Sequence, residues 1–122
     1  MTKQIKTTRR RRLVPRVKVW IECGGRYVFG FGLSEILEAV ERAGSIKQAA
    51  ADLHKSYRYV WGRIKDAETA IGLPLVDTQV GGQGTQRSFL TDAARDLVQD
   101  FLALRERLME VVDREFARRF DN

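Results

Sequence analysis

Basic and aromatic side chains are interleaved in residues 55–63, which have the sequence KSYRYVWGR. Positive charges neutralise phosphate groups, and aromatic rings stack on bases, so this mixture is typical of surfaces that bind nucleic acid. The longer stretch 54–65 has four basic side chains and no acidic one, whereas a solvated helix face usually mixes both signs of charge. The alternative is a core helix with some charge on its outer side.

Residues 56–71 form an amphipathic pattern when they are placed on a helix. One side is apolar and consists of Val60, Ile64, Ala67 and Ile71, with Tyr57 and Trp61 on its flank. The opposite side consists of Arg58, Gly62 and Lys65, and the other flank holds Tyr59 and Arg63, which are partly exposed. An apolar stripe attaches a recognition helix to its domain, while polar side chains in the first turns reach base edges and phosphates. The pattern therefore favours a helix that is core on one side and binding surface on the other.

Glycine at position 62 is unusual in the middle of this predicted helix. It costs about 1 kcal/mol relative to alanine, so a local reason is expected. Close approach to a DNA backbone or to a partner helix would supply one, and simple tolerance is the alternative.

Two further helices are predicted immediately before the amphipathic helix. Residues 33–43 have apolar side chains at helical spacing and are followed by Gly44, which suits a helix C-terminus. Ser45 and Gln48 then form a capping box, which predicts the start of a second, short helix. A tight turn at His54 separates that helix from the amphipathic one. Two helices joined by such a turn make a helix-turn-helix.

Two β-hairpins frame these helices. Residues 17–21 and 27–31 alternate between apolar and polar side chains, and two adjacent glycines between them suit a two-residue turn. Further along, the runs LVDTQV and SFLT flank the glycine-rich sequence GGQGTQR at 81–87, which predicts a second hairpin, or wing, after the helix-turn-helix. Backbone amides of its tip and Arg87 would contact phosphates or a minor groove, although a plain loop would have the same composition.

The last helix is predicted over residues 92–122, with Thr91 as its N-cap. Its apolar side chains follow heptads and extend around a wide face, which one small domain does not easily cover. We therefore expect a dimerisation helix, and packing on its own domain is the alternative. The predicted interface residues are Leu97, Phe101, Leu104, Leu108 and Val111.

The positive charge of the chain is concentrated near its N-terminus. The net charge is +6, but residues 1–18 contain eight basic side chains and no acidic one, whereas the rest of the chain has 14 basic and 16 acidic side chains. Residues 1–15 are therefore expected to form a flexible basic arm. Any positive surface of the folded part must be local.

Composition and motifs exclude several other classes of protein. No apolar run approaches the roughly 18 residues that span a bilayer, so we expect no membrane association and a cytoplasmic, nucleoid-associated location. One cysteine and one histidine, Cys23 and His54, supply neither a disulfide nor a metal site. The chain has no HExxH, no GxxxxGK[ST] loop and no triad-like spacing, so we expect neither an enzyme nor a cofactor.

Residues 16–105 resemble the N-terminal winged-helix domain of the ModE molybdate-responsive regulators, with a weaker similarity to the LysR-type DNA-binding domain. The matching stretches are GRYVFGFG, ILEAVERAGSI, QAAADL, SY followed by a basic residue and Trp61, PLV at 74–76, VGGQG at the wing and FLT before the long helix. The family's turn often has glycine where His54 stands. The resemblance implies a homodimeric, sequence-specific DNA-binding transcriptional regulator. The molybdate-binding domains of full-length members have no counterpart in this sequence, so molybdate binding is not expected from this chain alone.

Together these observations predict a mainly α fold with β-hairpins. A winged helix-turn-helix domain that includes the N-terminal hairpin is expected over residues 16–91, followed by the C-terminal dimerisation helix over 92–122, and the expected partners are double-stranded DNA and a second copy of the chain. The expected DNA-binding residues are Ser45, Lys47, Lys55, Ser56, Tyr57, Arg58, Tyr59, Arg63, Gly82, Gln83, Gly84 and Arg87. The alternative functions are a nonspecific architectural DNA-binding protein and a winged-helix protein-interaction module.

Overall fold

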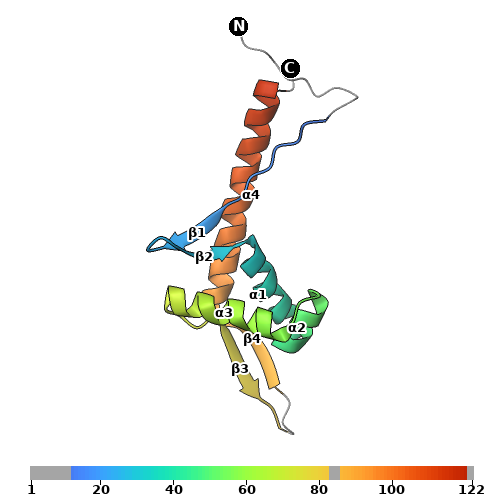
Figure 1. Ribbon diagram of the computed structural model, residues 1–122, viewed down its shortest axis with the longest axis vertical. Coiled ribbons are helices and arrows are strands. Elements are labelled where there is room, and N and C mark those ends of the chain that lie inside the picture. Colours follow the sequence, from blue (N-terminus) through green and yellow to red (C-terminus); the bar gives the residue numbers. More distant parts are fainter. Residues whose placement is uncertain (1–11, 83–85, 121–122) are drawn as a thin grey trace. The chain divides into compact units, whose positions relative to one another are not determined.

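The computed structural model describes residues 12–82 and 86–120, which form four helices and two antiparallel hairpins (Figure 1). In chain order the elements are β1 (Trp20–Cys23), β2 (Arg26–Gly30), α1 (Phe31–Ala43), α2 (Ile46–Asp52), α3 (Tyr57–Ile71), β3 (Val76–Val80), β4 (Gln86–Leu90) and α4 (Asp92–Phe120). Of the described residues, those within Val19–Leu102 make up one compact unit, and residues 12–18 and 103–120 belong to a second unit. The predicted mainly α fold with two hairpins is confirmed.

The core of the larger unit takes side chains from all four helices and from strands β2 and β4. Its buried apolar residues are Val28, Phe29, Leu33, Ile36, Leu37, Ala39, Val40, Ile46, Ala49, Ala50, Val60, Ile64, Ala67, Leu75, Leu90, Ala94, Val98 and Phe101. The rings of Phe29 and Phe101 meet edge to face, with their centroids 5.1 Å apart. The first turns of α4 therefore belong to this unit.

The position of Phe101 corrects one expectation for the dimer interface. Its side chain is only 1% exposed, so it fills the core of its own subunit and is not available to a partner. Heptad spacing did not reveal this, because an apolar side chain at that spacing fits a domain core as well as a coiled coil.

Serine side chains cap the first turns of both α2 and α3. Ser45 Oγ accepts a hydrogen bond from the backbone N–H of Gln48, and Ser56 Oγ accepts one from that of Tyr59, each at 3.0 Å. These bonds satisfy amides that the start of a helix leaves unpaired. The predicted capping box is only half formed, because Gln48 Nε2 donates to Asp52 Oδ1 at 2.8 Å.

The turn between α2 and α3 reverses the chain at His54, whose φ angle is 58°. The N–H of His54 donates to the carbonyl of Ala51 at 3.1 Å, and the N–H of Lys55 donates to that of Ala50 at 2.9 Å. This pair of bonds forms a Schellman motif, which usually places glycine at the left-handed position. The turn sets the direction in which α3 leaves α2.

Strands β1 and β2 form the first hairpin. Its turn consists of Gly24 and Gly25, whose φ angles of 60° and 80° suit a type I′ turn. Strand β1 begins at Trp20 and not at residue 17, where the alternating pattern begins. Val17 belongs instead to the second unit.

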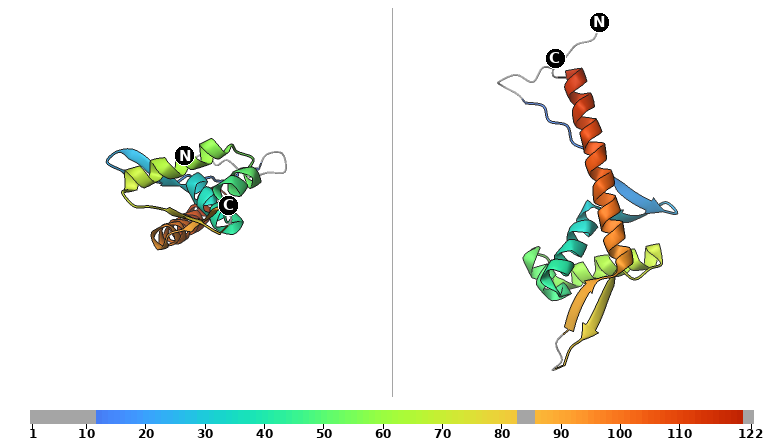
Figure 2. Two further views of the ribbon diagram at one scale, coloured as in Figure 1. Left: turned by 90° about the horizontal axis from the view of Figure 1, so that it is seen from below. Right: turned by 180° about the vertical axis from the view of Figure 1, so that it is seen from behind.

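Strands β3 and β4 form the predicted wing, with Val76 paired to Leu90 and Val80 paired to Gln86. Seen from behind, α3 crosses the root of the wing (Figure 2). Arg87, predicted for the tip, lies in β4 because strand pairing extends as far as Gln86. The predicted site residues Gln83 and Gly84 lie outside the described residues.

The second unit contains the remainder of α4 and residues 12–18 of the N-terminal segment. Leu104 and Val111 of α4 are 45% and 36% exposed, and Leu108 is half-buried. Residues 1–11 of the predicted basic arm, 1–15, lie outside the described residues. None of the described helices is both long enough and apolar enough to cross a membrane.

Candidate nucleic-acid interface

Helix α3 is attached to the core through one side and exposed on the other. Val60 and Ile64 are fully buried and Ala67 is 4% exposed, which confirms the predicted apolar stripe. Helix α3 has three aromatic side chains, Tyr57, Tyr59 and Trp61, and each is between 44% and 51% exposed. Three large rings at this exposure on one helix form a surface suited to binding.

One flank of α3 holds a cluster of Tyr59 with two cations. Arg63 Nη1 donates a hydrogen bond to the Tyr59 hydroxyl at 2.9 Å, and its guanidinium carbon lies 5.8 Å from the centroid of the ring. Lys55 Nζ lies 5.6 Å from the same centroid. Both distances are within the range of cation–π attraction. The structure thus brings together three of the predicted site residues.

The other flank of α3 faces the wing across a groove of about 710 Å³. Within it, Lys65 Nζ lies 5.7 Å from the centroid of the Trp61 ring system. The groove is lined by Ser45, Ile46, Lys47, Tyr57, Trp61, Ile64, Lys65, Val76, Thr78, Gln86 and Ser88. It contains two lysines and no acidic residue, so it suits an anionic ligand.

The remaining predicted residues are distributed around these two flanks. Arg58 is exposed on α3, and Gly82 and Arg87 are exposed on the wing. Trp61 and Lys65, which line the groove, were not among the predicted DNA-binding residues. The helical wheel placed Lys65 opposite the core stripe, and that signal was sufficient to include it. Trp61 was placed on the flank of the apolar stripe, and its 44% exposure is seen only in the structure.

Gly62 has no crowded neighbour. A methyl group added at this position would meet no atom within 4 Å among the described residues. Contact within the chain therefore gives no reason for glycine here, which leaves tolerance or close approach by another molecule.

The wing is attached to α3 by a carboxylate that the sequence did not reveal. Glu68 Oε2 accepts hydrogen bonds from the backbone N–H groups of Leu75 at 2.7 Å and Val76 at 3.1 Å. The other oxygen, Oε1, lies 3.2 Å from Lys65 Nζ. The side chain of Glu68 is only 14% exposed, so these bonds form in a largely dry site.

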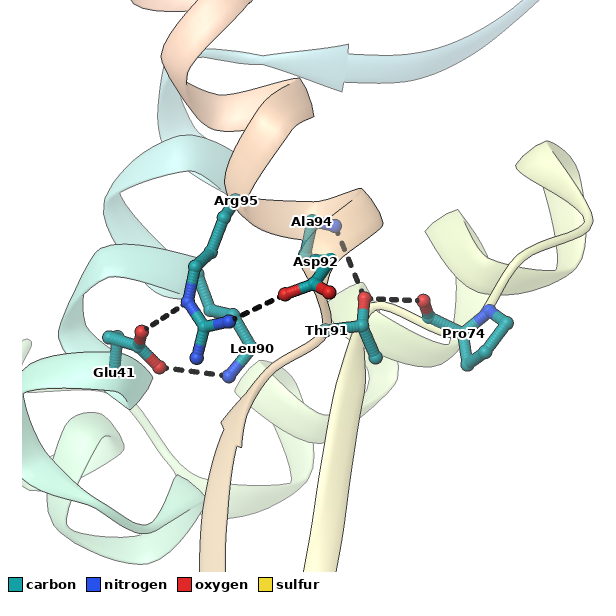
Figure 3. A network of polar contacts seen from close by, with 7 residues as sticks. All are labelled: Glu41, Pro74, Leu90, Thr91, Asp92, Ala94 and Arg95. Atoms are coloured by element: carbon teal, nitrogen blue, oxygen red, sulfur yellow. Dashed lines mark hydrogen bonds and ion pairs between the residues drawn. The ribbon is translucent and has the colours of Figure 1, made fainter.

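A second carboxylate attaches β4 to α1 and α4 (Figure 3). Glu41 Oε1 accepts the backbone N–H of Leu90 at 2.9 Å, and Glu41 Oε2 accepts Arg95 Nε at 2.8 Å. Arg95 also donates from Nη1 to Asp92 at 3.0 Å. One guanidinium therefore joins the first turn of α4 to α1 beside the end of the wing.

Thr91 joins the same end of the wing to the start of α4 (Figure 3). Its hydroxyl donates to the carbonyl of Pro74 at 2.9 Å and accepts the backbone N–H of Ala94 at 3.1 Å. The second bond is an N-cap, as predicted. The backbone N–H of Thr91 donates to the carbonyl of Leu75 at 3.0 Å, so one residue links the base of β3 to α4.

The charged groups at this junction affect each other's protonation. The hydrogen bond from Arg95, together with that from the Leu90 backbone, holds the pKa of Glu41 below its ordinary value of 4.5. The same bond raises the pKa of Arg95 above its already high ordinary value. Within the described ranges, no three His, Cys, Asp or Glu side chains lie close enough to hold a metal ion.

Comparison with known protein families identifies the family to which this arrangement of helices and wing belongs. The model of bacterial regulatory helix-turn-helix proteins of the lysR family matches residues 32–95, slightly more than half of the chain. The chain belongs to this family. The matched residues begin in the first turn of α1 and end in the first turn of α4, so the lysR-type region includes α2, α3 and the wing.

Two curated relatives are proteins named molybdenum transport protein ModE. The one from Herbaspirillum seropedicae is 31% identical over 80 residues, which are 66% of this chain and 30% of the relative. The one from Azotobacter vinelandii is 35% identical over 79 residues, or 65% of this chain and 29% of the relative. The chain thus spans less than a third of the length of these relatives, and the similarity to ModE is confirmed.

A solved structure shares the fold of this lysR-type region. Full-length CbnR complexed with its target DNA matches with a TM-score of 0.54 and 25% sequence identity. The match covers 73% of this chain and 29% of CbnR. The winged helix-turn-helix predicted from the sequence is therefore confirmed as the fold.

Proposed function

We propose that this lysR-family protein is a sequence-specific DNA-binding transcriptional regulator that acts as a homodimer in the cytoplasm. Helix α3 enters the major groove, and the wing contacts the adjacent backbone or minor groove. Membership of a regulatory helix-turn-helix family and the likeness to a protein solved on its target DNA support this proposal.

The central observation is the division of α3 into a buried side and an exposed polar and aromatic side. Val60 and Ile64 attach the helix firmly, so its exposed side chains are presented on a rigid support. Arg58 projects from the first turns, where a guanidinium can form a bidentate contact with guanine. A winged helix that only docked on another protein would not need four basic side chains and no acidic one over residues 54–65.

The experiment that tests the proposal is selection of binding sites from random DNA duplexes at physiological salt. Sequence-specific binding by a homodimer predicts a consensus with two-fold symmetry. The Arg58→Ala variant should lose preference at defined positions within each half-site. Binding to every duplex alike, with a steep loss of affinity as salt rises, would instead establish the architectural alternative.

The part of α4 from Ala103 onward is the proposed dimer contact. Leu104 and Val111 expose apolar surface there, and Leu108 is half-buried. The division into a winged domain at 16–91 and a dimerisation helix at 92–122 is part of this proposal. The double variant Leu104→Glu/Val111→Glu should sediment as a monomer, and a variant with the dimer mass would contradict the assignment. Ala103→Glu on an exposed position of the same helix is the matched control.

A further inference from the structure

The cluster of Lys55, Tyr59 and Arg63 carries two positive charges without an anionic partner among the described residues. Neither cation is part of any ion pair among the described residues, although six other pairs are formed there. Lys55 contacts the ring of Tyr59, and Arg63 contacts both its ring and its hydroxyl. Two cations held close together by a neutral ring form a site for an anion.

This cluster lines a depression of about 250 Å³ between α3 and the start of α1. The depression is lined by Gly32, Glu35, Ile36, Leu53, Lys55, Tyr59 and Arg63. Glu35 is its one carboxylate, and it forms no ion pair with either cation. The first turn of α1 contains no acidic residue. Two positive charges therefore face one negative charge, and neither cation is neutralised directly.

Gly32 leaves room for the guanidinium at the edge of this depression. A methyl group added at Gly32 would lie 4.0 Å from Arg63 Nη2, in ordinary contact with it. A longer side chain at this position would extend into the space beside the guanidinium. Arg63 therefore has Nη2 near the start of α1, while Nη1 is bonded to the Tyr59 hydroxyl.

The positions of the two cation clusters around α3 suggest what they bind. Successive residues of a helix are separated by about 100° around its axis, so Arg63 and Lys65 lie about 200° apart, on nearly opposite flanks. Gly62 lies about midway between them, on the side away from the core stripe of Val60, and Arg58 lies within about 20° of Lys65 around the axis but about two turns nearer the start of α3. A helix in the major groove has bases in front of it and one sugar–phosphate strand on each side.

We infer that Lys55 and Arg63 bind a phosphate of the DNA strand on the α1 side of α3, and that Tyr59 is the positioning residue that holds them there. Lys65, beside Trp61, binds a phosphate of the opposite strand on the side of the wing. Bases are contacted by Arg58 from the first turn of α3, about two turns before Lys65, and Gly62 allows close approach. This assigns Tyr59 to backbone contact and not to base contact, and it rests on the proposed function.

The test is ethylation interference on the DNA site obtained by selection, with the full chain. In wild-type complexes, ethylated phosphates on both strands of a half-site should block binding. Arg63→Gln should remove the block at one or two phosphates of one strand, and Lys65→Met should remove it at the other strand only. Each variant removes one phosphate contact per subunit, and so two per homodimer. It should therefore reduce the slope of log K against log salt by about two units and leave the consensus unchanged.

Tyr59 is tested by two substitutions that separate its ring from its hydroxyl. Tyr59→Leu should abolish the same interference signals as Arg63→Gln, although both cations remain, and Tyr59→Phe should retain them in part because the ring remains. Arg42→Gln removes one exposed charge from the last turn of α1 and should change neither signal. Equal thermal unfolding of all variants excludes a folding defect.

Two outcomes would overturn the inference. One is that Arg63→Gln and Lys65→Met remove the interference from the same strand, or that neither variant removes it from any strand. The other is a changed consensus for Tyr59→Leu, which would make Tyr59 a base contact. If wild type selects no sequence, the proposed function fails, and the salt slope of Arg63→Gln on a random duplex still decides whether Arg63 binds phosphate.

Discussion

The two strands of the wing are attached to the domain by two carboxylates from different helices. Glu68 of α3 holds the start of β3, and Glu41 of α1 holds the end of β4. Each accepts backbone N–H groups that have no partner in the two-stranded sheet, and each also contacts a cation. The chemistry is the same, but the surroundings differ.

The two carboxylates differ in their exposure and in the helix that carries the neighbouring cation. Glu68 is 14% exposed and accepts two backbone amides, and its lysine belongs to the same helix. Glu41 is 36% exposed and accepts one backbone amide, and its arginine belongs to α4. A buried carboxylate with several donors is a structural acceptor, whereas a more exposed one is screened by water. Glu68 should therefore contribute more to folding, and Glu41 more to the junction with α4.

The largest expected effect is that of Glu68→Ala. Removing the carboxylate leaves the N–H groups of Leu75 and Val76 without an acceptor beside a buried side chain, which should lower the free energy of unfolding by about 2–3 kcal/mol. Urea denaturation measures this loss. Asp66→Ala on an exposed position of the same helix is the matched control and should change stability little. Equal losses for both variants would remove Glu68 from this role.

Glu41→Ala should have a smaller effect. One backbone amide loses its acceptor and Arg95 retains Asp92, so the expected loss is about 1 kcal/mol, reduced by solvent screening at a side chain more than a third exposed. The same denaturation experiment measures it, with Glu38→Ala as the control on the exposed side of α1. A loss as large as that of Glu68→Ala would contradict the ranking by exposure.

Acid should affect Glu41 in a defined direction. Because its pKa is lower in the folded protein than its ordinary value of 4.5, its contribution is complete above that pH and is lost as pH falls through the lower, folded value. Wild type should therefore lose more stability below pH 4.5 than Glu41→Gln does. Glu115, whose pKa is also lowered by Arg118, contributes equally to both proteins, so it cancels in the comparison. Identical acid profiles would contradict the proposed bond.

The sequence predicted the elements whose signals are local. The core stripe of α3, the serine cap of α2 and the glycine turn of the first hairpin all depend on residues within a few positions of one another. Their positions were correct because periodicity and capping act over one or two turns of helix. The candidate surface of α3 followed from the same pattern.

The parts that the sequence did not predict depend on contacts between distant residues. Glu41 and Leu90 are 49 positions apart, and nothing around either of them indicates the bond. Glu68 has an ordinary place in a charged helix, where i,i+3 pairing with Lys65 is the usual expectation. Phe101 was assigned to the dimer interface because its actual contact, Phe29, lies in the first hairpin, far away in the sequence, and no local pattern indicates that contact. The pairing of Tyr59 with two cations needed coordinates as well.

The smallest expected effect on folding is that of Lys65→Met. Lys65 is 47% exposed and lies 3.2 Å from Glu68, and exposed pairs of this kind contribute little, so the change in unfolding free energy should be less than about 0.5 kcal/mol. The backbone bonds of Glu68 do not need the lysine. Urea denaturation checks this expectation, provided that the dependence of the unfolding free energy on urea concentration is the same for both proteins. A loss of unfolding free energy close to that of Glu68→Ala would mean that the lysine supports the wing. If stability is unchanged while DNA affinity falls, the charge of Lys65 acts on the DNA, and the two carboxylate oxygens of Glu68 have separate roles. Oε2 holds the wing, and Oε1 pairs with a half-exposed lysine that can exchange this pairing for a phosphate.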